Sequence, residues 1–198
     1  MNKLAKCFAT SLVLGTLTSP AIADSFYGAL DFGQTTAKDA CSIAGLPAGT
    51  TVTGCKDTAT MYRVAGGYQF APMWGAEVSY GTYGKASLGI VNIPGTGSLA
   101  AGDWQSTGLQ VSATGSFPVG DAFALTGKIG IARTDLKISA TSLTASTTNL
   151  GYGIGAQYSV SKSIALRVQY EDLGTVGDAS STGTAKMTLL SGGVILKF

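Results

Sequence analysis

The sequence predicts an all-β protein: an eight-stranded antiparallel transmembrane β-barrel with short turns at one end and four longer loops at the other. Three observations lead to this fold class. Eight segments alternate between apolar and polar or small residues, as strands with two different faces do. The connections between these segments alternate between short and long. Beyond residue 23, no segment approaches the roughly 20 apolar residues that a membrane-spanning helix needs.

Each predicted strand is near or above the roughly 9–11 residues that a tilted strand needs to cross a bilayer. The eight segments are 25–34, 60–70, 73–83, 104–117, 122–133, 148–160, 163–173 and 185–198. The short connections are 71–72, 118–121 and 161–162, and the long ones, rich in Gly, Ser and Thr, are 35–59, 84–103, 134–147 and 174–184. In outer-membrane barrels, short turns face the periplasm and long loops face outward.

The alternation assigns one face of each strand to lipid and the other to the barrel interior. In segment 60–70, Tyr62 and Val64 share one face, whereas Arg63 and Ala65 share the other. A soluble β-protein would turn its polar face outward, but here the larger apolar face must meet lipid. The small interior residues suit an eight-stranded barrel, whose lumen is just wide enough for side chains.

Aromatic residues predict two girdles at the membrane interfaces. The girdle near the short turns contains Phe26, Phe70, Trp74, Phe117, Phe123, Tyr158 and Phe198. The girdle near the long loops contains Tyr80, Tyr83, Trp104 and Tyr170. The alternative, an ordinary soluble β-core, would have to bury all of these large side chains.

Residues 1–23 have the pattern of an export signal peptide. Lys3 and Lys6 precede an apolar stretch from Phe8 to Leu17, and 21–23 read Ala-Ile-Ala, a cleavage pattern. We therefore expect a mature barrel domain of residues 24–198. The formal charge of +2 comes from the two lysines of the signal, so the mature chain is neutral. The mature chain has no excess of basic residues that would indicate nucleic-acid binding.

Cys41 and Cys55 flank 13 residues in a polar stretch rich in Gly and Thr. In an oxidising compartment such a pair is expected to form a disulfide across a loop. A metal site is not expected, because the chain has no His and its third cysteine lies in the signal. No other cofactor is expected either.

Several short stretches give the chain a family resemblance. They are Phe-Tyr-Gly-Ala at 26–29, Gly-Tyr-Gln-Phe at 67–70 followed by Trp-Gly-Ala-Glu at 74–77, Gly-Lys-Ile-Gly at 127–130, Leu-Arg-Val-Gln-Tyr at 166–170 and the terminal Phe198. In order and spacing, the mature chain resembles the OmpA-type eight-stranded outer-membrane barrels, including the opacity-like proteins. The resemblance implies an outer-membrane location and an assembly signal in Leu196 and Phe198. The peptidoglycan-binding domain of larger members is not expected here.

Charged residues on the inward faces form the one candidate functional cluster that the sequence predicts. They are Asp31, Arg63, Glu77, Lys128, Arg167, Glu171 and Lys197. Because unpaired buried charges are costly, we expect these residues to form a salt-bridge network in the lumen. The family resemblance places Glu77, Lys128 and Arg167 in its central cluster. Such a network acts either as a plug or as a gate that re-pairs to open a narrow path. We expect the plug, and expect Glu77→Ala to admit water and anions.

The sequence favours a structural or surface-interaction role in membrane integrity, loop presentation or adhesion. The alternative is a small porin-like channel gated by the charge network, and a lipid-modifying enzyme is a distant third. We expect no catalytic residues, because a chain without His lacks the usual acyl-transfer machinery. The expected partners are outer-membrane lipid and lipopolysaccharide, the outer-membrane assembly machinery, periplasmic chaperones and a host or surface ligand that contacts the loops. A monomer is expected.

Overall fold

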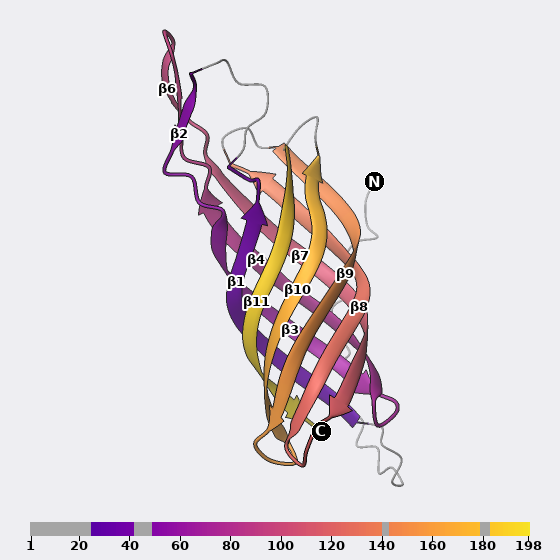
Figure 1. Cartoon of the computed structure of the whole chain (residues 1–198). Helices are drawn as coiled ribbons and strands as arrows, with labels where there is room; N and C mark the ends of the chain where they lie inside the picture. The colour runs from indigo at the N-terminus through magenta and orange to yellow at the C-terminus, as the bar shows by residue number, and fades with distance from the viewer. Residues whose placement is uncertain (1–24, 42–48, 140–142, 179–182) are drawn as a thin grey trace, which may run out of the picture.

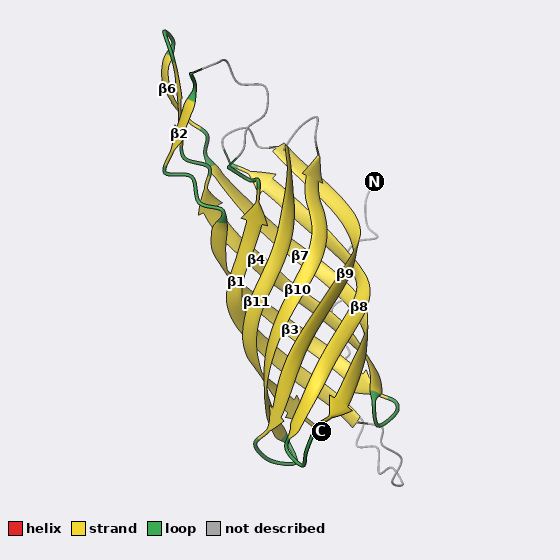
Figure 2. Cartoon of the chain, viewed as in Figure 1, coloured by secondary structure: helices red, strands yellow, loops and turns green. Residues whose placement is uncertain are grey.

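The computed structural model describes residues 25–41, 49–139, 143–178 and 183–198, and the predicted signal peptide lies outside them. Eight antiparallel strands close into a barrel in the order β1-β11-β10-β9-β8-β7-β4-β3, which confirms the predicted fold class (Figure 1 and Figure 2). The barrel strands are β1 (Ser25–Lys38), β3 (Thr58–Gln69), β4 (Trp74–Ser87), β7 (Asp103–Pro118), β8 (Phe123–Ile138), β9 (Leu143–Ser159), β10 (Ile164–Asp178) and β11 (Gly183–Lys197). Among these residues no helix is long and apolar enough to cross a bilayer.

The first and last barrel strands pair with each other and close the sheet. Their register runs from Tyr27 opposite Lys197 to Lys38 opposite Lys186. Closure matters in a membrane, because a backbone N–H or C=O left at an open edge would have no water to bond.

The two faces of the strands differ as the alternation predicts. On β3, Tyr62 and Val64 are 51% and 53% exposed, whereas Arg63 and Ala65 are buried. The same alternation holds on β4, where Val78 and Tyr80 point outward, and on β10, where Leu166 and Val168 do. The outward face is therefore an apolar belt, and the inward residues fill the lumen.

Several strands extend further toward the long loops than the sequence predicts. β8 continues to Ile138 and β9 begins at Leu143, with Thr134 opposite Thr147 in a regular ladder. Two of the four predicted long loops, 134–147 and 174–184, are therefore mostly strand. These two segments are rich in Thr and have few lipid-facing apolar residues. The apolar–polar alternation that marks a strand is therefore lost there, although the backbone pairing continues.

Two barrel strands contain a bulge that a glycine makes possible. The register shifts between Thr82 and Gly84 on β4, and between Asp172 and Thr175 on β10. Gly84 has a φ of 99° and Gly174 a φ of 75°, in the left-handed region that favours glycine. The Gly174 N–H donates to Asp172 Oδ1 at 2.8 Å, which fixes the second bulge.

Three short strands form a second sheet beyond the rim of the barrel, which we call the arm. It consists of β2 (Thr51–Thr53), β5 (Ile90–Ile93) and β6 (Gly97–Ala100) in the order β2-β5-β6. The arm rises at the long-loop end, at the upper left of Figure 1. All three strands lie in the predicted loops 35–59 and 84–103, since strands of three or four residues are too short to show an apolar period.

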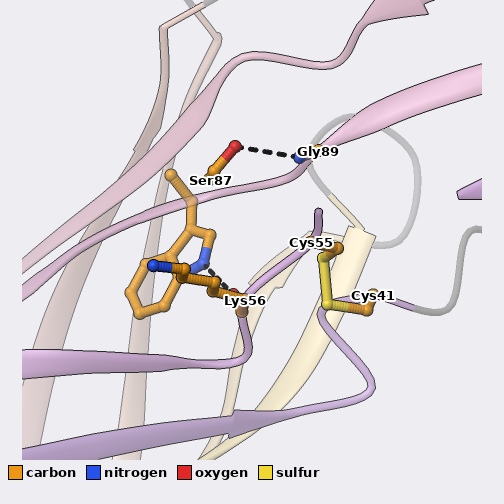
Figure 3. Close-up of a disulfide and its surroundings, with 6 residues drawn as sticks. Cys41, Cys55, Lys56, Ser87 and Gly89 are labelled. Carbon is orange, nitrogen blue, oxygen red and sulfur yellow. Dashed lines mark hydrogen bonds between the residues drawn. A yellow bond between two sulfur atoms is a disulfide. The ribbon is translucent and has the colours of Figure 1, made fainter. Parts of the chain in front are cut away.

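A disulfide joins Cys41 to Cys55 at the base of the arm, with the two Cα atoms 5.9 Å apart, which confirms the predicted pairing. Around it, the Lys56 N–H donates to the Ser87 carbonyl at 2.8 Å, and the Trp104 indole N–H donates to the Lys56 carbonyl at 3.3 Å. Figure 3 shows this junction. The two hydrogen bonds attach the segment between β2 and β3 to β4 and β7, and the disulfide attaches it to the segment that follows β1.

A layer of apolar side chains fills the lumen toward the long-loop end, and we call it the apolar layer. Its members, all at most 8% exposed, are Ala37, Ala59, Met61, Tyr83, Ala86, Trp104, Ala132, Leu136, Leu173, Val176, Met187 and Leu189. The girdle prediction is therefore wrong for Tyr83 and Trp104. Tyr83 lies three residues after the outward-facing Tyr80, so alternation turns it inward, and Trp104 shares the inward parity of Ser106.

The closed barrel should be heat-modifiable on gels. Every barrel strand is paired on both sides, so the folded form should resist dodecyl sulfate at room temperature and unfold on boiling. We expect two mobilities for inserted protein, compared before and after boiling. A single mobility under both conditions would argue against a closed sheet.

Candidate functional site

Six of the seven inward charges that the sequence predicts meet in the middle of the lumen. They come from five strands: β1, β3, β4, β8 and β10. Their side chains are at most 4% exposed, so the cluster is buried in the lumen. Each side chain reaches the centre because it lies on the inward face of its strand.

The six side chains form a closed ring of alternating charge, which we call the charge ring. Two arginines lie on either side of Asp31, and Lys128 completes the cationic set. The N–O contacts in order are Asp31–Arg63 at 2.9 Å, Arg63–Glu171 at 2.6 Å, Glu171–Lys128 at 2.8 Å, Lys128–Glu77 at 3.5 Å, Glu77–Arg167 at 2.6 Å and Arg167–Asp31 at 2.7 Å. Every carboxylate therefore contacts two cations, and every cation contacts two carboxylates.

Further hydrogen bonds fix the orientation of the ring. Arg167 donates to both carboxylate oxygens of Asp31, through Nε and Nη2, each at 2.7 Å. This bidentate geometry is the strong form of a charged hydrogen bond. Tyr27 donates its hydroxyl to Glu77 at 3.0 Å, and Arg63 donates to Gln169 Oε1 at 3.1 Å. The ring is thus tied to uncharged neighbours on β1 and β10.

Inward glycines leave the space that the ring occupies. Gly153 lies between Lys128 and Glu171 in the strand register, and Gly193 lies between Arg167 and Asp31. A Cβ on Gly153 would lie 2.6 Å from Glu171 Cγ, and one on Gly193 would overlap the Asp31 carboxylate. These glycines let long charged side chains pass over a neighbouring strand.

The seventh predicted charge, Lys197, lies outside the ring. Within the described part of the chain, no ion pair joins it to a carboxylate, and it lines a cavity of about 250 Å³ at the short-turn end. Its Cα partner Tyr27 is four residues from Asp31 on β1, about 13 Å along the strand. Parity alone placed Lys197 inward, but membership of the ring also requires the same depth. Glu77, Lys128 and Arg167 line the same cavity.

The apolar layer lies on the other side of the ring, toward the long loops, and is not among the features predicted from the sequence. Met61, Tyr83, Leu173 and Leu189 are each 0% exposed. The signal was present, because all four share the inward parity of charged or small residues on their strands. The lumen therefore has a polar cavity at one end, the charge ring in the middle and apolar packing beyond it.

The two predicted assembly-signal residues lie at the short-turn end, near the C terminus marked in Figure 1. Leu196 is 47% exposed on the outer wall and Phe198 is 83% exposed. The Phe198 N–H donates to the Phe26 carbonyl at 2.9 Å, so its backbone is held while its ring stays free.

Taken together, the closed sheet, the lipid-facing belt and the packed lumen define an outer-membrane eight-stranded barrel. The family model described as OmpA-like transmembrane domain matches residues 21–198. The chain belongs to this family of outer-membrane proteins.

Curated relatives agree with this assignment. The chain is 28% identical over 142 residues to Outer membrane protein A of Klebsiella pneumoniae, a match that covers 67% of this chain and 39% of the relative. Outer membrane protein A of Salmonella typhi is 30% identical over 142 residues, with 67% and 38% covered. The chain thus spans about two fifths of the length of these relatives.

Solved structures share the fold at low sequence identity. OprG from Pseudomonas aeruginosa is 15% identical with a TM-score of 0.57, over 88% of this chain and 97% of that one. Neisserial surface protein A is 16% identical with a TM-score of 0.54, over 89% and 100%. These similarities concern the barrel fold.

Breaking the charge ring should destabilise the barrel strongly. Glu77→Ala leaves Lys128 and Arg167 each with one carboxylate fewer in a buried site, which costs about 3–5 kcal/mol. Urea unfolding in lipid vesicles measures this change. Lys197→Ala is the matched control, because Lys197 faces the same lumen outside the ring and should change stability by less than about 0.5 kcal/mol. Equal losses for both variants would contradict the ring's structural role.

Proposed function

We propose that the barrel is a sealed anchor in the outer membrane that supports membrane integrity and presents its arm and loops at the cell surface. The observation that carries this proposal is the filled lumen. A neutral ring of three acids and three bases is followed by twelve buried apolar side chains. A lumen filled in this way suits a scaffold better than a conduit.

The arm supports the surface-interaction part of the proposal. The short turns face the periplasm in outer-membrane barrels, so the arm projects from the cell. Residues 88–102 contain no charged side chain, and Ile90 and Leu99 are 47% and 69% exposed. The disulfide and the Lys56 bonds hold the base of this surface in place. A host or surface ligand would meet an ordered, uncharged sheet there.

The same proposal includes the expected envelope partners. The apolar belt contacts membrane lipid, and the outer rim would contact lipopolysaccharide. The free Phe198 ring and the exposed Leu196 suit recognition by the assembly machinery, because neither side chain is used in packing the lumen. Periplasmic chaperones would hold the chain before insertion, and the barrel would act as a monomer.

A gated channel is the second candidate, and the periplasmic cavity favours it. That cavity of about 250 Å³ reaches Glu77, Lys128 and Arg167, so solvent can approach the ring from one end. Opening the ring would still leave the apolar layer in the path. We assign no enzymatic reaction, because each ring carboxylate is committed to two cations.

The sealed-anchor proposal predicts no steady conductance in planar bilayers. Glu77→Ala should remain closed despite its lower stability, because the apolar layer persists, and this revises the expectation from the sequence alone. Combining Glu77→Ala with Met61→Ser and Tyr83→Ser should raise conductance, since polar side chains would hydrate the layer. The double variant Met61→Ser and Tyr83→Ser isolates the contribution of the ring. Stable, large channels formed by the wild type would favour the channel instead.

The disulfide should order the arm without supporting the barrel. The chain-entropy relation gives about 3 kcal/mol for a loop of about 15 residues. Cys41→Ser should therefore speed tryptic cleavage after Lys56 while the heat-modified gel shift stays unchanged. Cys55→Ser is the matched variant and should behave identically. Loss of the gel shift in both variants would show that the barrel itself needs the bond.

A further inference from the structure

The lipid-facing wall contains a groove across β4, β7, β8 and β9, with a volume of about 590 Å³. Its floor is formed by Gly115 and Gly127, which lie opposite each other on β7 and β8. Trp74 adjoins Gly115 on one side, and Ile154 adjoins Gly127 on the other. Two adjacent outward positions therefore lack a side chain between two large ones.

The barrel does not need glycine at these two positions. A Cβ on Gly127 would lie 3.9 Å from its nearest neighbour, the Gly153 carbonyl oxygen, and one on Gly115 would lie 3.4 Å from the Trp74 ring. Both are ordinary contacts. By contrast, a Cβ on the inward-facing Gly130 would overlap the Val111 carbonyl. What the outward glycines supply is the hollow itself.

The side chains around the groove exclude a polar ligand. The outward-facing residues Phe117, Leu125 and Ile129 are 60%, 52% and 53% exposed and continue the apolar wall. The Tyr152 hydroxyl donates to Asp172 at 3.2 Å and is already used. Lys128 borders the groove, but its ammonium lies inside the lumen in the charge ring.

We propose that this groove binds one acyl chain of a phospholipid from the periplasmic leaflet. The chain is an outer-membrane barrel, so hydrocarbon covers this wall. Phe117 and Leu125 border the groove toward the short turns, and Ile129 borders it toward the long loops, so the groove lies next to the girdle near the short turns. Its volume lies within the roughly 300–1,000 Å³ of small-molecule sites. A flexible linear chain fits a hollow between the Trp74 and Ile154 side chains, whereas the convex wall of a second barrel would span it.

This inference rests on the membrane location and not on the proposed surface role, so either can fail alone. Native mass spectrometry of the full mature barrel, released from nanodiscs of palmitoyl-oleoyl-phosphatidylethanolamine, measures bound lipid. We expect one retained lipid per barrel. Gly127→Ile should lower the retained population roughly tenfold or more, the factor that corresponds to about 1.4 kcal/mol. Gly127→Ala, which fills less of the groove, should give an intermediate loss.

Gly66→Ile is the matched control, because Gly66 also faces outward and a Cβ there has no neighbour within 4 Å. It should retain lipid like the wild type, and the heat-modified gel shift should show that every variant is folded. Equal retention in the wild type, Gly127→Ile and Gly66→Ile would overturn the proposal.

Fluorescence of Trp74 locates the bound chain. Trp74 is 58% exposed and borders the groove, whereas Trp104 is 3% exposed inside the lumen. In vesicles with a fraction of phosphatidylethanolamine carrying brominated acyl chains, Trp74 fluorescence should be quenched by the chain held in the groove. Gly127→Ile should lower this quenching, and Gly66→Ile should leave it at the wild-type value. Quenching that instead falls as the protein-to-lipid ratio rises would identify a second copy as the occupant and overturn the lipid assignment.

Discussion

The narrow lumen of an eight-stranded barrel constrains every inward side chain, because little water can enter to satisfy a polar group. The charge ring meets this constraint by giving each acid two bases and each base two acids. Replacing a buried ion network with well-packed apolar residues can leave the stability of a protein unchanged or raise it. The contribution of the ring is therefore something other than net stability. Contacts from five strands fix their mutual register and depth, which a uniform apolar filling would leave less defined.

The rest of the interior is organised around that ring. Toward the periplasm, polar residues line a cavity that solvent can reach, and Lys197 lies there. Toward the cell surface, the apolar layer takes side chains from seven of the eight barrel strands, and Trp104 connects it to the base of the arm through Lys56. The disulfide then holds the arm at the point where the layer ends. The surface that the protein presents is thus connected to its packed core.

Period-two alternation was sufficient to predict the barrel, its lipid-facing wall and six members of the ring. It failed where a second condition applied. Lys197 has the right parity but the wrong depth, and depth depends on the stagger between strands, which no single strand encodes. Tyr83 and Trp104 were assigned by residue type to a girdle, although their parity turns them inward. The arm and the outer ends of β8 and β9 were missed because backbone pairing continues where the apolar period ends.

We propose that the charge ring and the apolar layer seal the lumen between a periplasmic cavity and the cell surface. The accessibility of single introduced cysteines to a membrane-impermeant thiol reagent tests it most directly, using oriented vesicles of the mature barrel. Gln157→Cys, in the cavity, should react only from the periplasmic side, and Ser106→Cys, buried beyond the ring, should react from neither side. Labelling of Ser106→Cys from the periplasmic side, or of Gln157→Cys from the outer side, would show a continuous water path and contradict the account.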